Sequence, residues 1–274
     1  MRGWLIYRQQ DADKNHLFIQ WLQSEAVTIN IELTLVIYEE LTYGVEAGKL
    51  FVYWKEGDDP DFVIMRAIDP LLSQQLEWIN IPVFNSAQVA AIANDKAKTH
   101  QLFARHGIPM MDTHFAARPH DISYPLIIKD VTGRGGEQVS KIRSKQDMPD
   151  LTDGNYILQQ MAMPGKDVRV FVLGNMIIGS VLRTSESDFR ANYSLGGTAT
   201  LYELSTAEHA LVHQIIDVIQ ADFIGIDFVF GRDGTLYLNE IEDIVGSRTL
   251  TSLTDINIAQ LYMTYIKKQL LAKD

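Results

Sequence analysis

The chain has 274 residues, of which 46% are hydrophobic and 22% charged, a composition typical of a globular protein with two domains or one elaborated domain. Its net charge of -11 argues against a protein that binds nucleic acid regardless of sequence, and the absence of cysteine excludes disulfides, a thiol nucleophile and a zinc-thiolate site. No apolar run approaches the roughly 20 residues of a membrane span and no basic-then-apolar signal pattern opens the chain, so we expect a soluble, cytoplasmic protein without nucleic-acid or membrane partners.

The first third of the chain alternates between strand-like and helix-like stretches. The runs that predict strands are 3–7, 31–37, 50–54 and 62–65. Apolar residues at helical spacing predict a helix that starts near Asp13 and a second one that opens at Asp69-Pro70. This alternation predicts a small parallel-sheet domain that ends near Phe84. Arg66 follows the fourth run, where it would face either a ligand at the carboxyl edge of the sheet or solvent.

A longer helical stretch, Ser86–Arg105, follows. It has a break at Asn94-Asp95, and Gly107 ends it in the position that favours glycine after a basic last turn. Lys96 starts the second piece of this helix, where the helix dipole does not favour a positive charge. Such a lysine faces either solvent or a phosphate group, and this stretch alone leaves both alternatives open.

From Tyr124 the pattern changes to short strands and tight turns. The strand Leu126–Asp130 carries Lys129 and runs into TGRGG, Thr132–Gly136, whose glycines allow backbone N–H groups to cradle a phosphate. The spacing matches neither the P-loop nor the dinucleotide fingerprint, so a mobile glycine-rich loop without a ligand is the alternative. Further strands are predicted at 156–163, 168–173 and 176–182, followed by a polar loop with Arg190 and Asn192 and by a helix with a capping box at Ser205 and Glu208.

The stretch GIDFVFGRDGTLYLNEIEDIVGSR, from Gly225 to Arg248, predicts two strands joined by a tight turn at Asp233-Gly234. Alternation along a strand places Glu240 and Glu242 on one face, and the hairpin brings Asp227 opposite them. Buried like charges repel one another, so three converging carboxylates favour a cation, and their oxygens suit magnesium best. An exposed acidic face is the alternative.

Taken in order, five parts of the chain resemble the ATP-grasp superfamily and, within it, the RimK-like peptide and amino-acid ligases. They are VFNSAQVAAIANDKAKTHQLFARHGIP, YPLIIKDVTGRGG, ILQQMAMPGKDVRVFVLGN, SDFRANYSLGG and the carboxylate pair of Asp227 and Glu240. The resemblance implies an α/β (α+β) ATP-grasp fold. In it, an N-terminal pre-ATP-grasp domain with a small parallel sheet, residues 1–84, precedes the ATP-grasp domain, residues 85–274, which contains a mobile lid at roughly 117–163.

The resemblance also implies nucleotide-binding roles. Lys96 and Lys129 would contact the phosphates of ATP, and Asp167 would accept hydrogen bonds from the ribose hydroxyls. Relatives often have Glu at the adenine hinge, so the glutamines of this chain change the hydrogen-bond pattern there. The other residues that the resemblance assigns to the nucleotide are Gly133, Gly135 and Gly136 of the covering loop, Gln159, Gln160 and Met161 of the hinge, and Asn192 near the phosphate or the metal.

The expected metal ligands are Asp227, Glu240 and Glu242, which would hold Mg²⁺ or Mn²⁺ beside the phosphates. Relatives usually have Glu-x-Asn in this motif, whereas this chain has Glu-Ile-Glu. The additional carboxylate still offers an oxygen to the metal, but it adds a negative charge next to ATP. It would either strengthen metal binding or mark altered or lost catalysis.

The activity implied by the resemblance is an ATP-dependent ligation of a carboxylate to an amine through an acyl phosphate. Arg190 and Arg248 would stabilise the oxyanion, and together with Arg66 they favour an anionic substrate. An amino acid such as glutamate would be joined to an acid, a peptide or a carrier protein, and a homo-oligomer agrees with the family precedent. Two alternatives are a phosphotransferase on the same fold and a non-catalytic ATP-binding or regulatory protein. The pair His209 and His213, at metal-compatible helical spacing but without a third ligand, is interpreted as a surface feature.

Overall fold

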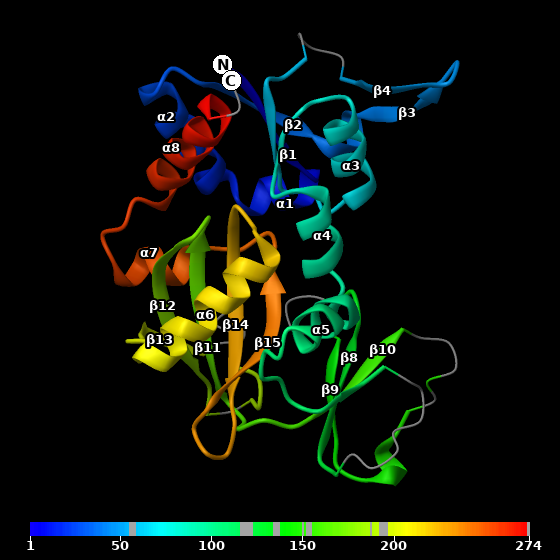
Figure 1. Cartoon of the computed structure of the whole chain (residues 1–274), viewed down its shortest axis with the longest axis vertical. Coiled ribbons are helices and arrows are strands. Elements are labelled where there is room, and N and C mark those ends of the chain that lie inside the picture. The colour runs from blue at the N-terminus through cyan, green and yellow to red at the C-terminus, as the bar shows by residue number, and fades with distance from the viewer. Residues whose placement is uncertain are drawn as a thin grey trace. The chain divides into compact units, whose positions relative to one another are not determined.

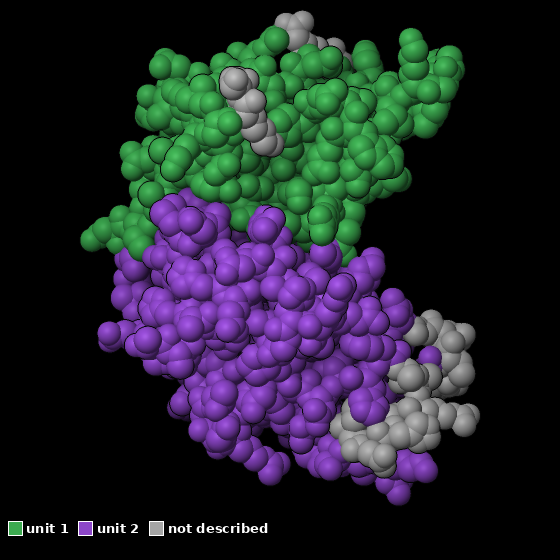
Figure 2. Space-filling model, viewed as in Figure 1, with its two compact units in different colours: residues 1–91, 221–223, 255–274 green, residues 92–220, 224–254 purple. Residues whose placement is uncertain are grey.

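The computed structural model describes residues 1–54, 59–115, 123–133, 138–149, 151, 155–186, 188–191 and 197–272. By their contacts the chain divides into two compact units (Figure 2). The first comprises residues 1–91, 221–223 and 255–274, and the second comprises residues 92–220 and 224–254. Among the helices described, none combines the length and the apolar character that crossing a membrane requires. The domain boundary after residue 84 and the lid at 117–163 stay predictions.

The first unit is built on a four-stranded parallel sheet, as predicted. Its strands are β1 (Arg2–Tyr7), β2 (Glu32–Ile37), β5 (Phe62–Met65) and β6 (Val83–Phe84), in the order β2-β1-β5-β6. β5 is buried along its whole length, and β1 from its second residue on, so these strands read as continuous apolar runs. The helices are α1 (Gln9–Lys14), α2 (His16–Thr28), α3 (Pro70–Trp78), α8 (Ile258–Leu271) and the 3₁₀ helix η1 (Tyr38–Glu40), while α4 (Ala87–Ala93) contains the boundary at residue 91.

Helix ends in the first unit follow local capping chemistry. Asp69 caps α3 as predicted, because one carboxylate oxygen accepts hydrogen bonds from the second and third following backbone N–H groups, each at 3.0 Å, and Pro70 occupies the first turn. The predicted start of the preceding helix at Asp13 is wrong. α2 begins at His16, because the backbone leaves helical geometry at Asn15, and Asp13 belongs to the short α1.

Two further predictions for the first unit are corrected. The strand predicted at 50–54 does not join the parallel sheet, because β4 (Lys49–Tyr53) pairs antiparallel with β3 (Thr42–Glu46) as a separate hairpin. Arg66 is buried at the end of β5, so its interpretation as a solvent-facing residue is wrong. Its Nε donates to the hydroxyl of Tyr7 at 3.2 Å, which anchors the guanidinium at the carboxyl edge of the sheet.

The second unit contains two sheets (Figure 1). The antiparallel four-stranded sheet has the order β7 (Thr113–His114), β10 (Tyr156–Gln160), β8 (Leu126–Asp130) and β9 (Val139–Ile142). The five-stranded sheet has the order β13 (Thr198–Leu201), β12 (Met176–Thr184), β11 (Lys166–Leu173), β14 (Phe223–Phe230) and β15 (Leu236–Glu242). The helices are α5 (Lys96–Arg105), α6 (Thr206–Ile219), α7 (Arg248–Leu253) and the 3₁₀ helix η2 (Lys145–Asp147). The break between α4 and α5 and the capping box of α6 are confirmed.

The hairpin of β14 and β15 has the predicted turn. Gly234 has a φ of 82°, and Asp233 closes the turn by accepting hydrogen bonds from the backbone N–H and the hydroxyl of Thr235. The register pairs Asp227 with Glu240, as the alternation predicts. Directly after this pair the register shifts by one residue, because the next pair of the ladder skips one residue of β15. The hairpin therefore carries a bulge beside its carboxylates.

Candidate active site

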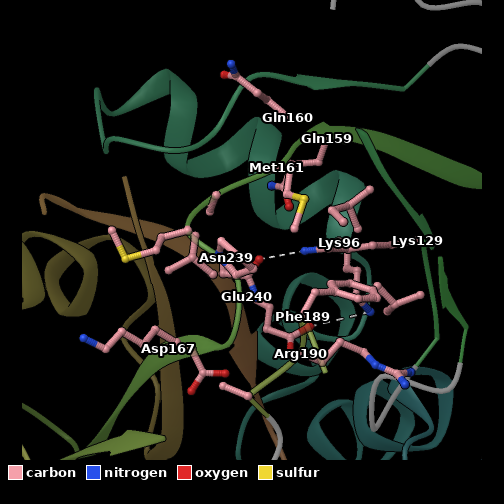
Figure 3. A pocket seen from close by; sticks show the side chains of 18 of the residues that line it. Lys96, Lys129, Gln159, Gln160, Met161, Asp167, Phe189, Arg190, Asn239 and Glu240 are labelled. Carbon is pink, nitrogen blue, oxygen red and sulfur yellow. Dashed lines mark hydrogen bonds and ion pairs between the residues drawn. The ribbon is translucent and has the colours of Figure 1, made fainter. Parts of the chain in front are cut away.

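A pocket in the second unit is lined by strands of both sheets and by the start of α5 (Figure 3). Its apolar lining includes Ile127, Val139 and Val229. Many of the residues predicted to bind the nucleotide line this pocket, namely Lys96, Lys129, Gly133, Gln159, Gln160, Met161 and Asp167. The structure therefore brings together residues that are up to 71 positions apart in the chain, from 96 to 167, around one cavity.

The side chains of the three predicted hinge residues are oriented differently. Gln159 is buried, and its amide nitrogen donates to the hydroxyl of Thr113 at 3.2 Å. The side chain of Gln160 points away from the other labelled residues, whereas Met161 lies among them (Figure 3). The backbone N–H of Gln160 is also engaged, since it donates to the carbonyl of Asp112 at 2.8 Å. The side chain of Gln160 is therefore not directed at the pocket lysines.

Two lysines from different elements meet at the pocket. Lys96 is 9% exposed at the start of α5, its Nζ donates to the carbonyl oxygen of Gly133, and it lies 3.7 Å from a carboxylate oxygen of Glu240. The alternative in which this lysine faces solvent is therefore wrong. Lys129 on β8 is 8% exposed, and its Nζ donates to Oδ1 of Asn239 at 2.6 Å. Burial lowers the pKa of Lys129 to about 8, although the charge of Glu240 opposes the shift.

Three carboxylates converge on the five-stranded sheet, as the alternation of β15 predicts. One oxygen from each of Asp227, Glu240 and Glu242 lies within 4.8 Å of the other two. Asp227 is 2% exposed and the two glutamates are partly buried, so the alternative of an exposed acidic face is wrong. Carboxylate oxygens in this arrangement are suitable ligands for Mg²⁺ or Mn²⁺.

Two buried arginines join these carboxylates into a network. Arg169 on β11 donates to both oxygens of Asp227, each at 2.7 Å, and its Nη2 lies 2.5 Å from Glu242. Arg183 on β12 donates to Asp227 at 2.8 Å and to Asp167 at 2.5 Å. Burial alone would raise the pKa of Asp227, but the two guanidinium groups outweigh it and hold that pKa well below its usual range. Asp227 is therefore ionised at neutral pH despite its burial.

The pKa values of two neighbouring carboxylates shift in the opposite direction from that of Asp227. Burial raises the pKa of Asp167 to about 6, although Arg183 opposes the shift. Burial also raises the pKa of Glu242, against the opposing charge of Arg169. Four acidic side chains, Asp167, Asp227, Glu240 and Glu242, thus share this region with four basic ones, Lys96, Lys129, Arg169 and Arg183. The cluster is balanced in charge, which allows so many ionisable groups to be buried together.

Comparison with known proteins identifies the family of this chain. Residues 93–266 match the model of the RimK-like ATP-grasp domain. The chain belongs to this family. Human N-acetylaspartylglutamate synthase A is 28% identical to the chain over 232 residues, which cover 75% of the chain and 59% of that protein. A probable alpha-L-glutamate ligase of Legionella pneumophila (strain Corby) is 29% identical over 213 residues, which cover 72% of the chain and 70% of that ligase.

A solved structure agrees with this RimK-like ATP-grasp assignment at the level of the fold. The ATP-grasp ligase PsnB, complexed with minimal precursor, Mg and ADP, superposes with a TM-score of 0.72 at 16% identity and covers 98% of both chains. The predicted family and the predicted α/β ATP-grasp fold with an N-terminal parallel sheet are thereby confirmed. The identity is too low to transfer more than the fold.

The remaining predicted residues of this RimK-like chain have different outcomes. Arg190 lines the pocket and its guanidinium pairs with Asp188 at 2.7 Å, whereas Arg248 begins α7, is exposed and is not part of the pocket lining. Three predicted residues, Gly135, Gly136 and Asn192, lie outside the described residues. His209 and His213 are exposed on α6 and do not contribute to the carboxylate group, in agreement with their interpretation as surface residues.

Sequence reasoning missed several residues that this RimK-like site contains. Arg169 and Arg183 are charged residues within otherwise apolar strands. Arg169 lies two positions after Asp167 on β11, and Arg183 on β12 is paired with Asp167, so the three share one face of the sheet. This placement of charges within apolar strands was the available signal. The sequence around Asn239 and His100 contains no comparable pattern that would have indicated a role in the site. His100 is buried on α5, its ring nitrogen lies 3.1 Å from the carbonyl oxygen of Asn239, and burial lowers its pKa to about 4.

Proposed function

We propose that this RimK-like chain is an ATP-dependent carboxylate-amine ligase that forms an amide bond through an acyl phosphate. One observation supports this most directly: two buried lysines line a pocket of an ATP-grasp fold together with Glu240, one of three converging carboxylates. The names of both relatives contain glutamate, which supports an amino acid such as glutamate as one substrate. The other substrate would be an acid, a peptide or a carrier protein, and a further PsnB complex, which contains a precursor peptide, supports a peptide.

The chemistry of the pocket lining supports ATP as its ligand. The apolar lining from Ile127, Met161 and Val229 suits a purine base. Lys96 and Lys129 place two ammonium groups where phosphates would lie, and buried cations interact strongly with phosphate oxygens. Asp167 would accept hydrogen bonds from the ribose, and the loop at Gly133 to Gly136 would cover the phosphates, as in the resemblance from which these roles were predicted.

Mg²⁺ or Mn²⁺ fits the three carboxylates. Asp227, Glu240 and Glu242 offer anionic oxygens within 4.8 Å of one another. Oδ2 of Asp227 accepts from both Arg169 and Arg183, whereas its Oδ1 accepts from Arg169 and keeps a second lone pair for an ion. The bound ion would supply positive charge next to the phosphates. Arg169, at 2.5 Å, balances the charge of the second glutamate of the motif, which offsets the additional negative charge beside ATP and supports a functional rather than a degenerate site.

In the proposed reaction, an oxygen of the substrate carboxylate attacks the terminal phosphorus of ATP, and ADP leaves. The amine nitrogen then attacks the acyl carbon, phosphate leaves with the former carboxylate oxygen, and the nitrogen loses a proton. No side chain forms a covalent bond, so positioning and charge stabilisation supply the rate. Lys96 and Lys129 would neutralise the phosphates, and Arg190 would stabilise the oxyanion at the acyl carbon. The exposed position of Arg248 leaves its catalytic role a prediction.

Release of ADP from Mg-ATP tests this function, with pools of amino acids and short acidic peptides as substrates and mass spectrometry of the products. We expect turnover that requires both an acid and an amine, and a product heavier than the acid by one amide condensation. Lys129→Ala and Glu240→Ala should each abolish turnover while the circular dichroism spectrum stays native. Full activity of either variant would contradict the assigned site.

The same screen separates the two alternatives. A phosphorylated acceptor formed without an amine would establish a phosphotransferase. Tight ATP binding without turnover in any pool, including pools with carrier proteins, would establish a non-catalytic nucleotide-binding protein. The homo-oligomeric state and the cytoplasmic location stay predictions, which size-exclusion chromatography and cell fractionation would test.

A further inference from the structure

Asn239 stands in the pocket although strict strand alternation would turn it away. It directly precedes Glu240 on β15, and both residues line the pocket. Neighbouring residues of a regular strand point to opposite faces. Here the register shifts between the pair Asp227 and Glu240 and the pair Phe228 and Leu238, which leaves Asn239 as the extra residue of a bulge. Bulges re-aim side chains in this way, often next to active sites.

The bulged side chain is directed at a single group. Oδ1 of Asn239 accepts a hydrogen bond of 2.6 Å from Nζ of Lys129, the lysine of β8 that reaches the same pocket (Figure 3). The backbone of Asn239 is held from the other side, because its carbonyl oxygen lies 3.1 Å from the ring nitrogen of the buried His100. The position of Asn239 is thus fixed by the bulge and by the contact of its backbone carbonyl with α5.

A neutral partner for a buried lysine has a specific consequence. Within the described part of the chain, Lys129 forms no ion pair within 4.0 Å, whereas Lys96, Arg169 and Arg183 each lie beside a carboxylate. A hydrogen bond to an amide satisfies one N–H of the ammonium group and leaves its charge uncompensated by direct contact. Exchanging that bond for a phosphate oxygen requires much less free energy than breaking a buried ion pair.

We propose that Asn239 is a positioning residue that holds the ammonium group of Lys129 in the pocket and releases it to a phosphate group of the bound nucleotide. The proposal rests on the proposed function only in taking a nucleotide as the ligand, and it does not depend on catalysis. It goes beyond the predicted site, in which Lys129 was assigned and no residue was assigned to orient it. It also gives the bulge in β15 a function.

Binding of ADP and of adenosine, measured by isothermal titration calorimetry, tests the proposal. Asn239→Leu removes the acceptor with little change in side-chain shape, and Asn239→Asp replaces it by a carboxylate that neutralises Lys129. We expect both variants to raise the Kd for ADP about tenfold and to change the Kd for adenosine less than twofold, because adenosine has no phosphate. Asn175→Leu, at the exposed turn between β11 and β12, is the matched control and should leave both values unchanged.

A double-mutant cycle distinguishes positioning from a general structural role. In a Lys129→Met background, Asn239→Leu should have no further effect on the Kd for ADP. Equal losses for ADP and adenosine, or the same tenfold loss in the Lys129→Met background, would overturn the proposal. If Asn239→Leu does not fold, Asn239→Ala, which also removes the acceptor without adding a charge, decides through the same comparison. A wild-type protein that binds no ADP would overturn the proposed function as well, whereas ADP binding that is indifferent to Asn239 would overturn only this inference.

Discussion

The affinity for nucleotide should depend on the protonation of Lys129. Burial lowers the pKa of this lysine to about 8, so in the free protein it is mostly charged at pH 7 and mostly neutral at pH 9. Only the charged form attracts phosphate strongly. With a pKa of about 8, the charged fraction falls roughly tenfold between pH 7 and pH 9, so we expect the Kd for ADP to rise about tenfold over this range.

Lys129→Arg supplies the control, because a guanidinium group stays charged throughout this range. The assay is isothermal titration calorimetry with ADP at intervals of half a pH unit from about 7 to 9.5, where the nucleotide phosphates are mostly deprotonated. We expect the Kd of the wild type to rise with pH and that of the arginine variant to stay constant, whatever its absolute value. A wild-type Kd that does not change, or an equal slope in both proteins, would refute the assignment of Lys129 as a phosphate-binding residue.

Three further predictions concern the carboxylates and a helix cap. Asp227→Asn should lower the free energy of unfolding in urea by about 3–5 kcal/mol, because two buried guanidinium groups lose the carboxylate that they share, whereas the exposed control Asp217→Asn should change it by less than about 0.5 kcal/mol. Glu242→Asn should weaken Mn²⁺ binding without nucleotide on the order of tenfold by electron paramagnetic resonance, because one of three converging anionic donors becomes neutral, and an unchanged affinity would exclude Glu242 as a ligand. Ser205→Ala should lower the free energy of unfolding by about 1 kcal/mol, since it removes half of a capping box, and no change in urea unfolding would show that the cap is energetically silent.

Much of the fold was predictable because its local signals agree. Asp69 followed by proline marked the start of α3, and Ser205 with Glu208 marked the start of α6. The alternation in β15 predicted that Glu240 and Glu242 share a face with Asp227. The resemblance then ordered these pieces into an ATP-grasp protein, which the family match confirms.

What could not be predicted depends on contacts between distant residues. The hairpin β3–β4 replaced an expected strand of the parallel sheet, because an apolar run does not specify its pairing partner. Asn239 enters the pocket only because of a one-residue shift in register, which alternation along a single strand does not show. The sequence did not decide whether Lys96 and Arg66 face solvent or a ligand. Both are buried, and both contact residues far away in the sequence.

The proposed ligase converts a carboxylate to an acyl phosphate before the amine attacks. The most direct measurement uses the acid substrate identified in the ADP-release screen, labelled with oxygen-18 in its carboxylate, followed by mass spectrometry of the released phosphate. We expect one labelled oxygen in each phosphate, formed together with one ADP and one amide. Unlabelled phosphate released alongside the amide would contradict an acyl-phosphate mechanism, and phosphate released without any amide would contradict the ligase.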